Sequence, residues 1–317
     1  MALPINLNAI MNPFKVHILG CGSARPTPRH CLSAQIVNYN NCLYAIDCGE
    51  GMQAQLARHH LMTGKLDRIF ISHLHGDHVL GLPGLLSTMA LSERTSPIHI
   101  YSPGGLESVM RPFIEFFVPA PSFDIIFHPF STTQGATIFS NNTIEVQTVP
   151  LQHRVPCCGF IFREKQPLPH ILRDMIDFYG IPNYAIKSIK EGADWVMPDG
   201  QVVPHARLTK PAEKARSYAY LSDTAYDPAL AQAVEGVDLM YHEATYANDM
   251  LASASERGHS TTGQAAATAR DAHARQLIIG HYSSRYDKDA LEAMLLSECR
   301  AVFPNTVLAN EGLTFDV

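Results

Sequence analysis

Residues 73–78, which read His-Leu-His-Gly-Asp-His, contain four side chains of the kind that bind metal ions, and they follow the apolar run 69–71. Three histidines and an aspartate this close together cannot all point the same way from a helix or a strand, so they indicate a loop that folds back around a small cation. Imidazole nitrogens and carboxylate oxygens are the ligands that Zn²⁺ and similar divalent ions take. The segment therefore predicts a hydrolase that uses metal-activated water. A histidine-rich polar surface loop is the alternative.

Further ligand-type residues come just after short apolar runs, namely His153, Asp223 and His281. Each has an ordinary explanation, because a single histidine at a strand end is more often a hydrogen-bonded structural residue and an aspartate can cap a turn. Together with the 73–78 segment, however, they give seven side chains, which supply two four-coordinate ions if one carboxylate is shared. Two such ions hold a hydroxide nucleophile and neutralise the phosphoryl oxygens during in-line displacement at phosphorus.

The elements that must position these side chains can be predicted from the apolar pattern. In the first half we expect strands at 14–19, 34–37, 43–46, 68–72, 98–101, 125–130, 144–149 and 158–162, and helices at 52–59, 80–91 and 106–117. From about residue 217 strands and helices alternate, with strands at 218–221, 239–241 and 277–279 and helices at 262–273 and 289–302. Two β-rich halves that each carry helices favour an α/β fold, a four-layer αββα sandwich. Ligands at strand ends would then meet in a cleft along one edge.

The segment 164–216 differs from the rest of the chain, because it is rich in proline and its apolar periodicity is broken. We interpret it as an inserted arm within a single domain that spans 1–317. The alternative is a long disordered loop, although long structureless loops inside compact domains are uncommon and often functional.

Composition excludes several classes of protein. Hydrophobic residues make up 46% and charged residues 17% of the 317 residues, which is typical of a soluble globular protein. No apolar run approaches the length of a membrane span, and residues 1–13 lack a signal-peptide pattern. Seven cysteines without paired metal-binding spacing favour reduced, mostly buried thiols, so we expect a cytoplasmic protein. The net charge of −6 does not favour nucleic acid, and any RNA binding would depend on a local basic patch.

Six further motifs accompany the 73–78 segment. They are Leu-Gly-Cys-Gly-Ser-Ala-Arg-Pro at 19–26, Leu-Gln-His at 151–153 with Gly-Phe at 159–160, Ser-Asp-Thr at 222–224, His-Glu-Ala-Thr-Tyr at 242–246, Gly-His-Ser-Thr at 258–261 and His-Tyr-Ser-Ser-Arg-Tyr at 281–286. With these motifs nearly the whole chain resembles the metallo-β-lactamase superfamily, and within it ribonuclease Z, the tRNA 3′-end endonuclease. Residues 73–78 alone mark only the superfamily, whereas the last three motifs in this order are far more particular to ribonuclease Z.

The resemblance implies two divalent ions, Zn²⁺ in the first place, with Mn²⁺ or Mg²⁺ as alternatives. It implies that seven side chains hold them: His73, His75 and His153 the first ion, Asp77, His78 and His281 the second, and Asp223 both. Asp77 is also implied as the proton acceptor for the attacking water. Glu243 and His259 resemble a relay that protonates the leaving 3′ oxygen, in which a carboxylate orients an imidazole that acts as a general acid.

The resemblance further implies a homodimer and a flexible arm that grips the elbow of tRNA, usually through a Gly-Pro-rich tip. The corresponding stretch 180–187 reads Gly-Ile-Pro-Asn-Tyr-Ala-Ile-Lys, so the Pro-Pro-Gly-Pro tip is missing, and the arm mixes its lysines and arginines with nearly as many acids. Arg285, four residues after His281, would contact a substrate phosphate or form a structural ion pair.

Three hypotheses about function remain open from the sequence. The first is a metal-dependent endoribonuclease that removes the 3′ trailer from precursor tRNA and leaves a 3′-hydroxyl. The second is a small-molecule hydrolase of the same fold, such as a phosphodiesterase, which the negative net charge and the altered arm favour. The third is a catalytically silent metal-bound protein that binds RNA or acts as a scaffold, against which the intact ligand set argues.

Overall fold

The computed structural model describes residues 13–118, 121–286 and 288–317, and the chain in it divides into two compact units. The larger unit comprises the described part of Met1–Ile138 together with Val146–Phe162 and Ser217–Val317, and it contains every predicted site residue. The smaller unit comprises Phe139–Glu145 and Arg163–Arg216, so it adds a short stretch near residue 140 to the arm expected from the sequence.

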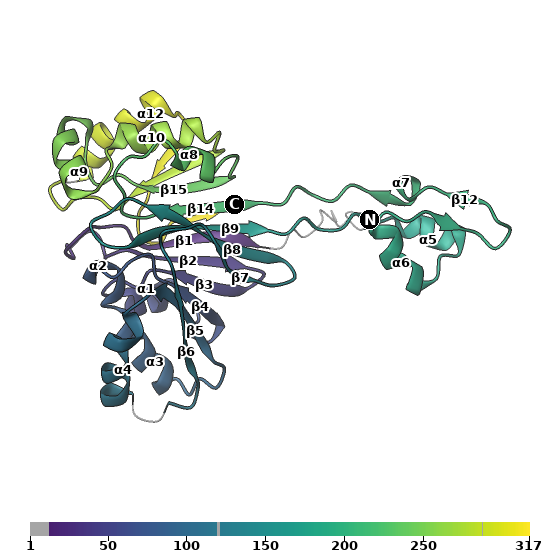
Figure 1. Ribbon diagram of the computed structural model, residues 1–317, viewed down its shortest axis with the longest axis horizontal. Coiled ribbons are helices and arrows are strands. Elements are labelled where there is room, and N and C mark those ends of the chain that lie inside the picture. The colour runs from purple at the N-terminus through teal and green to yellow at the C-terminus, as the bar shows by residue number, and fades with distance from the viewer. Residues whose placement is uncertain (1–12, 119–120, 287) are drawn as a thin grey trace, which may run out of the picture. The chain divides into compact units, whose positions relative to one another are not determined.

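One mixed sheet of the larger unit is built mainly from the N-terminal part of the chain. Its seven strands are, in spatial order, β18 (Thr314–Asp316), β1 (Phe14–Gly20), β2 (Ala34–Tyr39), β3 (Cys42–Ile46), β4 (Leu66–Phe70), β5 (Ile98–Pro103) and β6 (Ile125–Phe130). From β3 to β6 neighbouring strands run parallel. Helices α1 (Met52–Arg58), α3 (Leu82–Leu91) and α4 (Leu106–Phe117) cover the outer face of this sheet and share a buried apolar cluster with it (Figure 1).

The second sheet of the larger unit comes mainly from the C-terminal part. Its seven strands are, in spatial order, β17 (Thr306–Leu308), β16 (Gln276–Gly280), β15 (Leu239–Glu243), β14 (Ser217–Leu221), β9 (Cys157–Glu164), β8 (Ile144–Leu151) and β7 (Thr137–Ser140). The run from β14 to β17 is parallel, and every residue of β14 and β15 is buried, as expected for strands covered on both faces. Helices α8 (Leu230–Ala233), α9 (Leu251–Arg257), α10 (Thr262–Asp271) and α12 (Ser297–Val302) lie on its outer side (Figure 1).

Aromatic side chains join the inner faces of the two sheets. Phe70 of the first sheet packs against Phe160 and Phe162 of the second, with ring centroids 5.7 and 5.4 Å apart. Tyr44 contacts Phe162 at 6.3 Å in the same layer. These large buried rings exclude water from the space between the sheets and favour close face-to-face packing. The four-layer αββα sandwich expected from the sequence is therefore confirmed.

Most expected elements differ from the observed ones by no more than two residues at either end, and β7, β17, β18, α8 and α9 were not predicted. Two regions show the clearest differences. Residues 73–78 end in a short helix, α2 (Gly76–Val79), and the next helix begins at Leu82 because Pro83 suits the first turn of a helix. The helix expected at 289–302 is divided into α11 (Lys288–Ala290), a π-helical turn at Leu291–Leu296 and α12. Such π-turns interrupt the period of 3.6 residues without ending the helix, so they leave little trace in an apolar pattern.

The smaller unit is folded, so the alternative of a disordered loop is wrong. Its elements are α5 (Arg173–Tyr179), α6 (Asn183–Lys190), α7 (His205–Leu208) and the strand pairs β10 (His170–Ile171) with β13 (Thr209–Lys210) and β11 (Trp195–Val196) with β12 (Val202–Val203). It has its own small apolar core, which consists of Ile181, Ala185, Ile189, Val203 and Leu208. A half-buried ion pair between Glu164 and Arg216, with oxygen and nitrogen 2.7 Å apart, joins the two ends of the main segment of this unit.

The cysteines and the apolar content of the helices bear on two predictions made from composition. All seven cysteines are free thiols, and five of them are buried. None of the helices in the described ranges combines the length and the apolar character that crossing a bilayer requires.

Candidate active site

The predicted site residues meet at one edge of the larger unit, because they follow strands that end there. The positions are as follows: His73 and His75 after β4, Asp77 and His78 on α2, His153 after β8, Asp223 after β14, Glu243 as the last residue of β15, His281 after β16, and His259 just after α9. The strands β14, β15 and β16 are parallel, so their carboxyl ends lie at the same edge of the sheet, where ligands of such sheets commonly bind.

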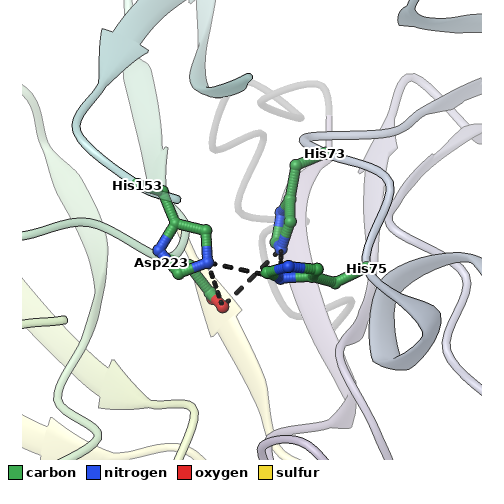
Figure 2. A group of neighbouring side chains, drawn as sticks. All are labelled: His73, His75, His153 and Asp223. Atoms are coloured by element: carbon green, nitrogen blue, oxygen red, sulfur yellow. Dashed lines mark hydrogen bonds and ion pairs between the residues drawn. The ribbon is translucent and has the colours of Figure 1, made fainter. Parts of the chain in front are cut away.

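Four of these side chains form a first cluster (Figure 2). The Nδ1 atom of His75 lies 3.1 Å from Nε2 of His73 and 3.3 Å from Nε2 of His153. The Oδ2 atom of Asp223 lies 3.6 Å from the same nitrogen of His73 and 3.8 Å from that of His153. Three imidazole nitrogens and one carboxylate oxygen therefore converge on a point that a single ion can occupy.

A second cluster shares Asp223 with the first. The Nε2 atoms of His78 and His281 lie 3.7 and 3.6 Å from Oδ2 of Asp77. The same two nitrogens lie 3.5 and 3.2 Å from Oδ1 of Asp223. One oxygen of Asp223 thus faces each cluster, which is the arrangement that a bridging carboxylate requires.

The donor set fits divalent metal ions on a structural criterion as well. The Nε2 atoms of His78 and His281 and the Oδ1 atom of Asp223 are buried and have no hydrogen-bond partner among the described residues. Leaving such a group without a partner costs about 1–3 kcal/mol, so three of them at one point call for a partner that is not a protein group. A cation bound by nitrogen and carboxylate oxygen satisfies all three, and this ligand type suits Zn²⁺ as well as Mn²⁺.

Asp47 fixes the orientation of His78. It follows β3 directly, its side chain is fully buried, and its Oδ2 accepts hydrogen bonds from Nδ1 of His78 and from the hydroxyl of Tyr220, both at 2.7 Å. The main-chain N–H of Ser72 donates to Oδ1 at 2.8 Å. Because the proton of His78 is held on Nδ1, the lone pair of Nε2 is directed at the second cluster, as carboxylate–histidine pairs do in metal sites.

Other histidines of the site are held in the same way. Nδ1 of His281 lies 2.9 Å from Oγ1 of Thr245, whose own hydroxyl donates to Glu243 at 2.7 Å. Nδ1 of His153 donates to the carbonyl of Gly258 at 2.7 Å. In each ring the outer nitrogen is occupied by a hydrogen bond, so the inner one is free for an ion.

Asp47 and Thr245 are not among the residues predicted from the sequence. The available signal for Asp47 was its place at the end of a predicted strand, which it shares with the predicted ligands. Its φ of 57° lies in the left-handed region, which a residue other than glycine adopts rarely. Thr245 lies inside the 242–246 motif, but its contact with a histidine 36 residues away depends on the fold.

Glu243 and His259 form a hydrogen-bonded pair beside the two clusters. Glu243 is fully buried, and its Oε1 lies 3.0 Å from Nδ1 of His259. The carboxylate also accepts hydrogen bonds from the main-chain N–H groups of Thr224, Thr245 and Ser260, at 3.1, 2.9 and 2.9 Å. This many donors fix the carboxylate in position and keep it ionised.

The charges of the site follow from these contacts. Burial alone would lower the pKa of His78, but Asp223 and Asp47 outweigh it and raise that pKa to about 10. Burial also opposes the charge of Asp77, yet the neighbouring imidazoles of His281 and His78 hold the pKa of Asp77 well below its usual value. For His259 burial is outweighed by Glu243, which raises the pKa to about 9. At neutral pH the carboxylates are thus ionised, and before an ion binds His78 and His259 are protonated, so an ion that binds at Nε2 of His78 releases a proton from it.

A cavity of about 720 Å³ opens onto both clusters and is lined by His259. Four arginines line it: Arg25, Arg154, Arg257 and Arg285. The acidic chain therefore carries a local basic patch at the site itself. Arg285 stacks over Tyr246, with its guanidinium carbon 5.1 Å from the ring centroid, and its Nε donates to the hydroxyl of Ser283. Among the described residues it forms no ion pair, so the interpretation as a structural ion pair has no support.

Comparison with known proteins gives consistent results. A family model described as "Anti-Pycsar protein Apyc1" matches residues 14–168, and one described as "Beta-lactamase superfamily domain" matches residues 207–282. The chain is 50% identical over 303 residues to a ribonuclease Z of Bacteroides fragilis (strain YCH46), covering 96% of this chain and 99% of the relative. It is 49% identical to a ribonuclease Z of Bacteroides thetaiotaomicron, covering 97% of this chain and 96% of the relative.

Among solved structures, the short form of human tRNase Z is similar, with a TM-score of 0.68 and 26% identity over 95% of this chain and 98% of that chain. The metallo-β-lactamase fold protein YhfI from Bacillus subtilis has a TM-score of 0.67 and 18% identity, covering 96% of this chain and all of that chain (100%), which bears on the fold alone.

Proposed function

The chain belongs to the ribonuclease Z family, and on that premise we propose that it is a metal-dependent endoribonuclease that removes the 3′ trailer from precursor tRNA and leaves a 3′-hydroxyl. The observation that carries the proposal is the 50% identity to a ribonuclease Z over 96% of the chain. The geometry of the site supports it, because two ligand clusters that share one carboxylate suit hydrolysis of a phosphodiester.

When bound, two divalent ions, which we propose to be Zn²⁺, lower the pKa of a water molecule and neutralise charge on the phosphoryl oxygens. Seven side chains of this protein would hold them: His73, His75 and His153 the first, Asp77, His78 and His281 the second, and Asp223 both. The hydrogen bonds of Asp47, Thr245 and the carbonyl of Gly258 orient His78, His281 and His153 before any ion or substrate arrives, so these three rings need little rearrangement on binding.

Asp77 is the proposed acceptor of the proton that the attacking water loses. The main-chain N–H of Ala24 donates to its Oδ2 at 2.7 Å, which holds the carboxylate at the wall of the cavity. A fixed carboxylate beside the nucleophile also orients the water for attack opposite the leaving oxygen.

His259 is the proposed general acid for the leaving group. Glu243 keeps the proton of His259 on Nδ1 and stabilises the charged ring, whose other nitrogen can donate to an oxygen in the cavity. Attack of water on phosphorus breaks the bond to the 3′ oxygen, and the proton from His259 converts that oxygen into the 3′-hydroxyl. The new phosphate group remains on the trailer.

The arginines around the cavity are the proposed contacts for the RNA backbone. Guanidinium groups bind phosphate oxygens in pairs of hydrogen bonds, and four of them line the cavity. Because these arginines form a local basic patch, an RNA substrate is compatible with the net charge of −6.

The smaller unit is the proposed exosite for tRNA. Two aromatic side chains of its helices, Phe178 and Tyr184, are largely exposed, which suits stacking on exposed bases. From family membership we also propose a homodimer located in the cytoplasm. Phe113, Phe116 and Phe117 of α4 are exposed, so the same helix offers apolar surface for a second copy.

One assay tests the main proposal and the competing phosphodiesterase hypothesis together. Precursor tRNA with a labelled 3′ trailer is incubated with metal-loaded protein, with and without chelator, beside the Asp77→Ala variant. We expect a single cut at the trailer junction that chelator and Asp77→Ala both abolish. Uncut tRNA together with rapid hydrolysis of a chromogenic phosphodiester would instead favour a small-molecule phosphodiesterase.

A further inference from the structure

A separate set of ligand-type side chains lies in the larger unit outside the active site. It consists of Cys21, just after β1, His30, just before β2, and Glu311, between β17 and β18. Sγ of Cys21 lies 3.3 Å from Nδ1 of His30, and the same nitrogen lies 3.1 Å from Oε2 of Glu311. Cys21 is fully buried, and the side chains of His30 and Glu311 are only 11% and 12% exposed.

The 3.3 Å between sulfur and nitrogen lies within the range for two ligands of one tetrahedral ion, and the 3.1 Å between nitrogen and oxygen is about 0.2 Å shorter than that range. Bonds of about 2.3 Å to sulfur and about 2.0–2.2 Å to nitrogen and oxygen place neighbouring ligand atoms about 3.3–3.6 Å apart. The main-chain N–H of Cys31 donates to Oε1 of Glu311 at 2.8 Å, so the other carboxylate oxygen is the one turned to His30. A carboxylate held in this way resembles a ligand that a backbone contact has oriented in advance.

A cavity adjoins one of the three side chains, His30. It has a volume of about 450 Å³, and His30, Arg29, Ala309 and Asn310 are among the residues that line it. Water and ions can therefore reach the imidazole without unfolding of the chain. Arg29 is the cation at this wall, and its guanidinium donates to the carbonyl of Tyr286.

We propose that Cys21, His30 and Glu311 bind one further divalent ion of the Zn²⁺ class, with water from the cavity as the fourth ligand. A thiolate and a carboxylate together carry two negative charges, so a dication makes the buried complex neutral and avoids the cost of burying net charge. A thiolate ligand disfavours Mg²⁺ and Ca²⁺, which prefer oxygen.

The position of this site in the fold indicates a structural role. The loop from Cys21 to His30 carries Ala24, whose N–H holds Asp77. The N–H of Tyr282, next to His281, donates to the carbonyl of Cys21 at 3.0 Å. An ion that joins this loop to Glu311 near the C-terminus would therefore anchor two segments that contact the catalytic clusters.

Cobalt substitution distinguishes this ion from those of the active site. The two catalytic clusters contain only imidazole and carboxylate ligands, whereas the further site contains sulfur. A thiolate bound to Co²⁺ gives an intense near-ultraviolet charge-transfer band, which imidazole and carboxylate do not give. Chelator-treated full-length protein is titrated with Co²⁺ alone. We expect the band to reach an intensity of one thiolate-bound Co²⁺ per chain by three equivalents of added Co²⁺, because the two catalytic clusters take up the other two.

Variants assign the band to its residues. Cys21→Ser should abolish it, and His30→Gln and Glu311→Gln should each weaken the affinity for Co²⁺ at least tenfold. Cys157→Ser is the matched control, because this buried thiol lies beside Asp223, where Sγ is 3.4 Å from the carbonyl oxygen, and the band should persist in it.

Two results would overturn the proposal. One is a wild-type protein with filled catalytic clusters and no thiolate band at millimolar Co²⁺. The other is a band that survives Cys21→Ser or disappears in Cys157→Ser. If Cys21→Ser does not fold, His30→Gln and Glu311→Gln decide the matter, since unchanged affinity in both would exclude the site.

Discussion

Replacing Asp47 by asparagine tests whether a residue that touches neither ion nor substrate sets the metal affinity. The carboxylate accepts four hydrogen bonds: from the main-chain N–H and the hydroxyl of Ser72 at 2.8 and 2.9 Å, and from His78 and Tyr220 at 2.7 Å each. An amide has one accepting oxygen and one donating nitrogen. In the variant, the NH₂ group of the asparagine must therefore face hydrogen-bond donors on one side.

The effect on metal affinity and on folding stability depends on which hydrogen bonds the NH₂ group disrupts. If the NH₂ group faces His78, the proton of that ring must move to Nε2, and the lone pair directed at the second cluster is lost. If it faces Ser72, a buried N–H loses its acceptor, which costs about 1–3 kcal/mol of folding stability. Loss of such a supporting carboxylate typically lowers metal affinity by about 10–100-fold, or about 1.4–2.7 kcal/mol.

The measurement is a zinc titration in competition with a chelating dye, on wild type and Asp47→Asn, followed by trailer cleavage at saturating zinc. We expect weaker zinc binding in the variant and a kcat near that of wild type once zinc is saturating. Asp238→Asn is the matched control, because Asp238 accepts a hydrogen bond from the main-chain N–H of Ser217 at 2.9 Å away from the site. Equal zinc affinity in a folded Asp47→Asn protein would refute the reasoning.

Three further predictions concern the relay and the smaller unit. His259→Ala should lower kcat for precursor tRNA by about 10²–10⁴-fold with little change in zinc content; an unchanged kcat would remove the residue from the mechanism. In chelator-treated protein, Glu243 outweighs burial and raises the pKa of His259 from 6.5 to about 9. The contribution of protonated His259 to the free energy of unfolding is therefore complete below pH 6.5 and is lost as the pH rises through 9. In urea unfolding between pH 6.5 and 9, the free energy of unfolding of wild type should fall by at most about 3 kcal/mol relative to that of Glu243→Gln. Parallel curves of unfolding free energy against pH for the two proteins would contradict this. Replacing residues 164–215 by a short glycine-serine linker should raise KM for precursor tRNA at least tenfold while a chromogenic phosphodiester is hydrolysed at the wild-type rate; equal KM values would exclude this unit as an exosite.

The candidate ligands could be chosen from the sequence because metal binding restricts residue type and local spacing. Four of the seven lie within one hexapeptide, and the others follow apolar runs that the structure shows to be strands. The orienting groups could not be predicted in this way. Asp47 acts through contacts with Ser72 and Tyr220, which only the packing of two sheets brings together.

The smaller unit illustrates a different limit. Its helices α5 and α6 have only 7 and 8 residues, which is too short for an apolar period to stand out among prolines. The cluster of Cys21 and Glu311 shows the same limit at long range, since 290 positions separate these residues in the chain. Local patterns carry no information about such pairs.

A carboxylate that serves two metal positions makes their filling interdependent. If Asp223 serves both proposed metal positions, the first ion bound would neutralise much of the negative charge of this carboxylate, and the second ion would meet a weaker attraction and a neighbouring cation. A population of molecules short of metal would therefore accumulate in a half-loaded form, which lacks one of the two charges that hydrolysis needs. As the metal supply falls, the rate of turnover would then decline more steeply than the total metal content. Much of the activity would be lost while most of the metal is still bound.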